Sequence, residues 1–252
     1  MDGGFPDQAH FSIGLQQHNF AAYDWIDRTD NVLVDLGDQF GNPVHPNTAV
    51  YFTTTGGKVT AAGYTNNLGQ ATATLLSGNP LPQDAALGAS NPSLYGSGTG
   101  YAWVSASTQG VSGSVSDSAL VLFSATTAPI TFNGASDTLS SVTIPANGSV
   151  NISVNISDRF GNPLEPNTTV ATTVLFTPPE APGMKFSVNA SGLPSTLGDY
   201  LTRGYGHTDF TLTLQSSIQG AALTSPIPFS VTVTVSGRNG PMQGVITGVV
   251  TP

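Results

Sequence analysis

The stretch DQFGNPVHPNTAV at 38–50 returns, with most of its residues unchanged, as DRFGNPLEPNTTV at 158–170. In each copy Gly-Asn tolerates positive φ, and the Pro that follows holds φ near about −65° and cannot extend a strand ladder. We expect the flanking Phe40 and Phe160 to close the end of a hydrophobic core. The motif predicts a tight turn between two strands, whose structural residues are Gly41, Asn42, Pro43, Gly161, Asn162 and Pro163.

The segments around this turn alternate between apolar and polar residues. VNISVNIS at 150–157 and FSVTVTVS at 229–236 each place their bulky apolar residues on one face. A period of two is typical of a half-buried strand. No helical period is evident, although a turn of helix could lie in QDAALGAS, 83–90. The pattern predicts an all-β protein, because similar segments recur at 31–36, 49–54, 71–75, 101–107, 119–123 and 210–214.

A second match indicates that whole domains are repeated. TNNLGQATATL at 65–75 corresponds to TRGYGHTDFTL at 202–212, a turn followed by a strand, and each copy then closes with two strands. The closing strands are expected at 101–107 and 115–123 in the first copy and at 229–236 and 243–250 in the second. We therefore predict two tandem β-sandwich domains joined near SATTAPIT, 124–131. Their ranges are 1–126, with an extended lead-in at 1–9, and 127–252.

Two long, turn-rich loops, 77–100 and 177–205, interrupt the strand pattern, and such loops often carry variable function. Aromatic residues lie in or beside them, and exposed aromatic rings can stack on sugars or anchor a protein partner. The alternative is that these rings only cover the ends of the sandwiches. The candidate ligand-contact residues are Tyr95, Trp103 and Tyr205.

Composition excludes several classes of function. The net charge is −9, only 8% of residues are charged, and the six basic residues are scattered, so the chain has no footprint for nucleic acid or anionic lipid. No apolar run is long enough to cross a bilayer, so no membrane insertion is expected. The start of the chain, MDGGFPDQ, has no signal-peptide pattern, so any export signal lies outside it.

Catalytic and metal-binding motifs are also missing from the sequence. There is no Cys, and the four His form no metal-ligand spacing. His45 stands where the second copy has Glu165, which indicates an exposed turn position. Asp24, Asp27 and Asp30 are spaced for either a solvated linker or a calcium loop, and they do not match an EF-hand. We expect no enzyme activity, no cofactor and no metal site.

The pattern D-x-F-G-N-P-V, followed by G-K-V-T at 57–60 and G-x-A-T-A-T-L ending at 75, resembles the bacterial Ig-like domain of group 1, the invasin/intimin type (Big-1). GGFPDQAHFSIGL at 3–15 also resembles the lead-in of such domains in bacterial cell-surface proteins. The resemblance covers nearly all of the first copy and the front half of the second. It implies an immunoglobulin-like sandwich in both copies and an extracellular or cell-surface location in a bacterium.

Three functions fit this organisation. The first is a non-enzymatic structural spacer whose partners are other domains or copies of the same protein. The second is an adhesin that binds host or cell-surface glycan or protein through 77–100 and 177–205. The third is a filament subunit in which GVITGVV, 244–250, and FSIGL, 11–15, pair as strands between molecules.

Overall fold

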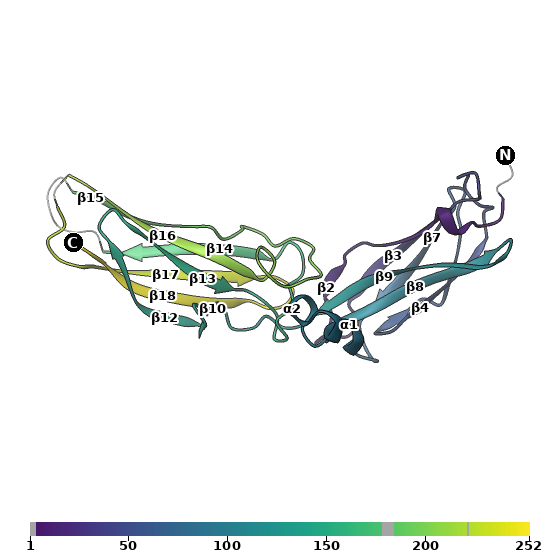
Figure 1. The fold of residues 1–252 in the computed structure, drawn as a ribbon, viewed down its shortest axis with the longest axis horizontal. Coiled ribbons are helices and arrows are strands. Elements are labelled where there is room, and N and C mark those ends of the chain that lie inside the picture. Colours follow the sequence, from purple (N-terminus) through teal and green to yellow (C-terminus); the bar gives the residue numbers. More distant parts are fainter. Residues whose placement is uncertain (1–3, 178–183, 221) are drawn as a thin grey trace. The chain divides into compact units, whose positions relative to one another are not determined.

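The computed structural model describes residues 4–177, 184–220 and 222–252. The chain divides into two compact units, Met1–Ala125 (unit 1) and Thr126–Pro252 (unit 2). Each unit is built from two antiparallel-rich sheets that face each other across a hydrophobic core (Figure 1). The chain is therefore an all-β protein of two tandem immunoglobulin-like sandwiches, as the sequence predicted.

Unit 1 places its N-terminal strand in one sheet and the following short strand in the other, because the chain crosses between sheets after Leu15. The first sheet has the order β1 (Phe11–Leu15), β3 (Thr29–Leu36), β7 (Gln70–Leu76), β5 (Lys58–Val59). The second has the order β2 (Asn19–Ala21), β9 (Gly113–Ser124), β8 (Tyr101–Gly110), β4 (Ala49–Thr54), β6 (Ala62–Tyr64).

Unit 2 repeats this plan with different edge strands. Its first sheet has the order β11 (Ala135–Ser136), β10 (Thr131–Phe132), β13 (Ser149–Asn155), β16 (Asp209–Gln219), β15 (Lys185–Ser191). Its second has the order β12 (Thr138–Pro145), β18 (Met242–Thr251), β17 (Ile227–Ser236), β14 (Thr169–Phe176). In both units a strand near the N-terminus runs parallel to the last strand: β2 beside β9, and β12 beside β18.

The alternation in the sequence sets which side chains enter each core. In β13 Ile152 and Val154 are buried while Asn151 and Ser153 are exposed, and β17 buries Phe229, Val231, Val233 and Val235. Burial of apolar area stabilises the fold by about 25 cal/mol per Å², so a register slip of one residue would exchange the two faces and lose this term. The strands expected near 101–107, 115–123, 229–236 and 243–250 are confirmed as β8, β9, β17 and β18.

Two loops that were expected to be irregular contain regular structure. The segment 77–100 includes α1 (Ala85–Ser90) and α2 (Pro92–Tyr95), so the helical turn expected within 83–90 is confirmed. The prediction of one loop over 177–205 is wrong, because β15 occupies Lys185–Ser191 and pairs with β16. The alternation of Phe186, Val188 and Ala190 is short and flanked by Pro- and Gly-rich sequence, which hid this strand.

The lead-in was expected to be extended over 1–9, and this prediction is wrong for its last residues, from Gln8 on. Gln8–His10 form a 3-10 helix (η1) whose N-cap is Asp7, because the Asp7 carboxylate accepts a hydrogen bond from the backbone N–H of Ala9 at 3.0 Å. Residues 1–3 lie outside the described residues.

The terminal strands do not have the open edges that a filament joined through them requires. β18, which contains 244–250, pairs with β12 on one side and with β17 on the other. β1 lies at a sheet edge, but its Ile13 N–H donates to the carboxylate of Asp117 on β9 at 3.3 Å. Joining molecules through 244–250 would require β18 to leave its own sheet, and so the prediction of simple strand addition there is wrong.

Candidate functional site

The repeated turn is held by one carboxylate in each unit. In unit 1 the carboxylate of Asp38 accepts from the backbone N–H of Phe40 at 2.9 Å and of Asn42 at 3.0 Å. Gly41 has φ +77°, and its N–H donates to the Asp38 carbonyl at 2.9 Å. Pro43 follows, where the chain turns toward β4. The turn is thus held by hydrogen bonds within the segment 38–42 itself.

Unit 2 repeats the same set of bonds. Asp158 accepts from the N–H groups of Phe160 and Asn162, both at 2.8 Å, and Gly161 has φ +82°. Pro163 then leads into the buried Leu164. The two turns place the motif at the same end of each unit, between β3 and β4 in unit 1 and between β13 and β14 in unit 2.

The Asp38 carboxylate has a shifted pKa, and its hydrogen bonds explain the direction. Burial raises the pKa of this carboxyl group. The hydrogen bonds from the backbone N–H groups of Asn42, Phe40 and Gly4 and from the Asn42 side chain lower that pKa by more than burial raises it. The net result is a pKa below the ordinary value, because hydrogen bonds to the charged form outweigh desolvation. Asp38 is therefore ionised at neutral pH and acts as a turn acceptor.

The two motif phenylalanines differ, and neither closes a core as expected. Phe40 is 78% exposed. Phe160 is half-buried under the guanidinium of Arg159, whose Cζ lies 4.6 Å from the ring centroid, and its carbonyl accepts from Arg203. Unit 1 has Gln39 where unit 2 has Arg159. The expectation failed because Phe, the third residue of the motif, belongs to neither hydrophobic core cluster.

The positions His45 and Glu165 are equivalent in sequence but not in environment. His45 is exposed, as expected, whereas Glu165 is only 4% exposed and accepts from the backbone N–H of Arg238 at 3.1 Å. The backbone N–H of Glu165 itself donates to the side-chain oxygen of Asn239 at 2.9 Å. The prediction of an exposed turn position is therefore wrong for unit 2.

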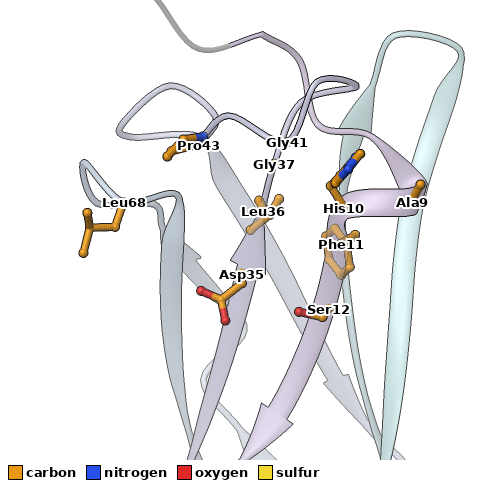
Figure 2. A pocket seen from close by; sticks show the side chains of 10 residues that line it. All are labelled: Ala9, His10, Phe11, Ser12, Asp35, Leu36, Gly37, Gly41, Pro43 and Leu68. Atoms are coloured by element: carbon orange, nitrogen blue, oxygen red, sulfur yellow. The ribbon is translucent and has the colours of Figure 1, made fainter. Parts of the chain in front are cut away.

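A shallow hollow of about 330 Å³ lies beside the turn of unit 1 (Figure 2). His10 and Leu68 stand on its opposite sides, and Asp35 and Ser12 lie lower in it (Figure 2). Its ionisable groups already have partners, since the His10 Nδ1 is 3.4 Å from Asp7 and Asp35 accepts from Gln70 at 2.8 Å. The lining residues are Ala9, His10, Phe11, Ser12, Asp35, Leu36, Gly37, Gly41, Pro43 and Leu68.

Two further hollows, of about 520 and 510 Å³, share the segment Gly4–Pro6 with its exposed Phe5. Tyr51 lines the first, and Phe40 and Val111 line the second. Together with Leu68, these are five apolar side chains with exposed fractions from 58% to 81%, and polar residues such as Asp7 and Gln39 lie between them. We call the set Phe5, Phe40, Tyr51, Leu68 and Val111 the apical surface of unit 1. Large exposed apolar patches often mark interaction sites.

The apical surface is not evident from the sequence, although one signal for it is present. Phe40 and Val111 are bulky apolar residues inside turns, in DQFGNP and TQGVSG. A tight turn cannot direct every side chain inward, so such residues are candidates for exposure. What the sequence could not show is that three separate turns and the lead-in lie together at one end of unit 1.

The candidate ligand-contact residues lie outside the apical surface, two in unit 1 and one in unit 2. Tyr95 packs edge-on against the buried Tyr101, with ring centroids 5.3 Å apart, and Trp103 donates its Nε1–H to Asp84, the N-cap of α1, at 3.0 Å. These two rings hold the folded segment 77–100 at the end of unit 1 opposite the apical surface. Tyr205 belongs to unit 2 and is 80% exposed.

Neither a metal cluster nor a membrane-spanning helix is found in the described part of the chain. Across residues 4–177, 184–220 and 222–252, no three or more His, Asp or Glu side chains gather to hold a metal ion. In the same ranges, no helix is long and apolar enough to cross a membrane.

No protein-family model and no curated protein matches this sequence. Among solved structures, the chain is similar to the Yersinia pseudotuberculosis adhesin InvE, with 14% identity, a TM-score of 0.34, and coverage of 97% of this chain and 60% of InvE. It is similar to a C-terminal intimin fragment solved with the intimin-binding domain of the translocated intimin receptor, with 18% identity, a TM-score of 0.36, and coverage of 96% and 63%.

It is also similar to FdeC, an Escherichia coli adhesin, with 17% identity, a TM-score of 0.39, and coverage of 99% of this chain and 66% of FdeC. The chain thus spans less than two thirds of each of these three structures. They are of the invasin/intimin kind that the repeated motif resembles.

Proposed function

We propose that this chain is a non-enzymatic spacer module of a bacterial cell-surface or secreted protein. The observation that supports it most directly is that the repeat forms two complete sandwiches, each with its own core and the same hydrogen-bonded turn. A spacer has to keep its length under load, and each unit has a suitable device.

That device is the parallel pairing of strands near the two ends of each unit. When the two ends of such a unit are pulled apart, the parallel pair is loaded in shear, so its backbone hydrogen bonds must fail together. In unit 2 the pairing of β12 with β18 runs from Thr138↔Val245 to Pro145↔Thr251. In unit 1 the pairing of β2 with β9 covers only Asn19–Ala21. We expect unit 2 to resist the larger force.

Single-molecule stretching of the whole chain tests this proposal. Two separate unfolding events are expected, each releasing roughly 400 Å of chain, from about 125 residues at about 3.3 Å each. Leu122→Pro changes a residue within the β2–β9 pairing of unit 1. If the weaker event belongs to unit 1, this variant should lower the unfolding force of that event and leave the force of the other event unchanged. Gradual extension without two discrete events would refute a load-bearing spacer.

A second function, adhesion, is favoured by the apical surface of unit 1. Its exposed apolar side chains offer contact area for a protein or a sugar face without any net charge. The variant F40S/V111S should lower binding to a positive spot on a glycan and host-protein array at least about tenfold, as expected for central interface residues. Leu81→Ser is the matched control, since Leu81 is exposed but lies outside that surface.

The same array distinguishes the two candidate adhesive surfaces. If Y95A, W103A and Y205A remove binding and F40S/V111S does not, adhesion uses the loops 77–100 and 177–205 instead. If the wild-type chain binds nothing on an array that a known adhesin does bind, the adhesion proposal fails and the spacer proposal is unaffected.

A further inference from the structure

Several sheet edges among the described residues are covered. The amide of Gln8 bonds both backbone groups of Ser116 on β9, at 2.9 and 3.0 Å. Asp117 accepts from the outward N–H of Ile13 on β1. β12 is interrupted by a register shift near Ser141, which has φ +63°. Such devices prevent unwanted pairing between molecules, because an open edge offers unpaired N–H and C=O groups.

β14 in unit 2 has no such cover from the described residues along most of its length. Its start is covered, since the N–H of Val170 donates to Ser195 O and the N–H of Leu197 donates to Thr168 O, both at 2.9 Å. Backbone groups alternate direction along a strand, and β14 pairs with β17 without a register shift. The N–H and C=O groups of Thr172, Val174 and Phe176 therefore point outward in the same phase as those of Val170.

No backbone or side-chain group within residues 4–177, 184–220 and 222–252 bonds these three outward positions. The counterpart in unit 1 is different, because β6 pairs there with β4 in antiparallel register, Ala49↔Tyr64 to Tyr51↔Ala62. At the same position in the repeat, unit 1 has an antiparallel partner strand, whereas in unit 2 no described residue pairs with this edge beyond Val170.

The composition of β14 favours pairing with itself. Its sequence TVATTVLF carries no charge and is rich in β-branched residues, which suit strands. Two copies would therefore place no like charges opposite each other. The side chains of Thr173 and Leu175 lie on the solvent face, and Leu175 is 64% exposed. β15, the edge strand of the other sheet, begins instead with Lys185.

We propose that β14 pairs with β14 of a second copy of this chain, antiparallel and centred on Val174. This register opposes Thr172 to the partner's Phe176 and Val174 to the partner's Val174. Each pair of opposed outward residues exchanges two backbone hydrogen bonds, so the register centred on Val174 forms about six between the molecules. A register centred on Thr173 would form about four. On the solvent face, Thr173 then lies opposite the partner's Leu175. The two sheets join into one continuous sheet through an isologous contact.

Charge pairs on the solvent face test both the contact and its register. T173K/L175K places Lys opposite Lys twice, while T173K/L175E places Lys opposite Glu twice. Both variants change only side chains that are exposed in the monomer, and equal thermal unfolding curves check that they fold alike. The whole chain is measured by sedimentation equilibrium from about 10 µM to about 1 mM, since so small an interface is weak.

We expect the wild-type mass to rise from 25.8 kDa toward about twice that value with concentration. The apparent dissociation constant of T173K/L175K should exceed that of T173K/L175E by at least about tenfold. A wild-type chain that stays monomeric throughout the range would overturn the proposal. A dimer that both variants form equally well would also overturn it, because the contact would then lie elsewhere.

Discussion

A substitution at Thr65 tests whether the repeated segment 65–75 stabilises the repeated turn segment 38–50. Thr65 is only 3% exposed and lies between the end of the turn segment and β7. It accepts from the backbone N–H of Thr48 at 3.0 Å and donates to the carbonyl of His45 at 2.7 Å. Thr65→Val keeps the shape of the side chain and removes both bonds, so no cavity forms.

The structure limits the size of the effect. The His45 carbonyl keeps the hydroxyl of Thr48 at 2.7 Å, and the Thr48 N–H keeps a longer bond to that carbonyl at 3.3 Å. Neither group is fully orphaned, so the loss is two net hydrogen bonds at about 0.5–1.5 kcal/mol each. We expect Thr65→Val to lower the free energy of unfolding of unit 1 by about 1–3 kcal/mol.

Tryptophan fluorescence isolates this unit, because both Trp residues, Trp25 and Trp103, lie in unit 1. With a urea dependence of about 1–3 kcal/mol per M, the fluorescence midpoint should fall by about 1 M. Far-UV circular dichroism should show unit 2 unfolding at an unchanged midpoint. The control is Thr48→Val, which removes a single hydrogen bond that is exposed to solvent, and it should lower the free energy of unfolding by less than Thr65→Val. A midpoint unchanged by Thr65→Val, or one equal to that of Thr48→Val, would refute the reasoning.

Two further predictions use the same fluorescence assay. The folded-state pKa of Asp38 lies below its ordinary value of 3.8. The ionised carboxylate therefore contributes fully to the stability of unit 1 above about pH 4, and this contribution is lost as the pH falls through the lower folded-state pKa. Asp38→Asn should make the stability of unit 1 fall less steeply in acid, and an unchanged fall would contradict the assignment. Gly69 has φ +74°, and an added Cβ would lie 2.3 Å from the Leu36 carbonyl oxygen, so Gly69→Ala should lower the stability of unit 1 by at least about 1–2 kcal/mol. Gly14→Ala, where no atom lies within 4 Å, should change it far less.

Much of the fold was predictable because its determinants are local. The turns depend on Asp38 and Asp158 bonding backbone groups two and four residues away. The strands depend on a period of two that a short window reveals, as in β13 and β17. The number and order of the main strands follow from these signals.

The candidate sites were less predictable because exposure depends on distant partners. Phe40 and Phe160 share one motif, yet only unit 2 supplies Arg159 and Arg203 to cover the ring and the carbonyl. Tyr95 and Trp103 stay predicted ligand contacts, and the sequence did not show that Tyr101 and Asp84 engage them within unit 1. A side chain's neighbours across the sandwich leave no trace in the sequence around it.

The sequence by itself determined a tandem all-β architecture, the position of both turns and the faces of the main strands, since each follows from backbone preferences and short-range periodicity. Only the tertiary structure decided which strands lie at sheet edges. β14 and β18 both look like apolar strands in sequence, yet β18 is paired on both sides, while no described residue bonds the outer edge of β14 beyond Val170. Edge position is set by which segments pair across the whole unit, and those hydrogen bonds join residues far apart in the chain.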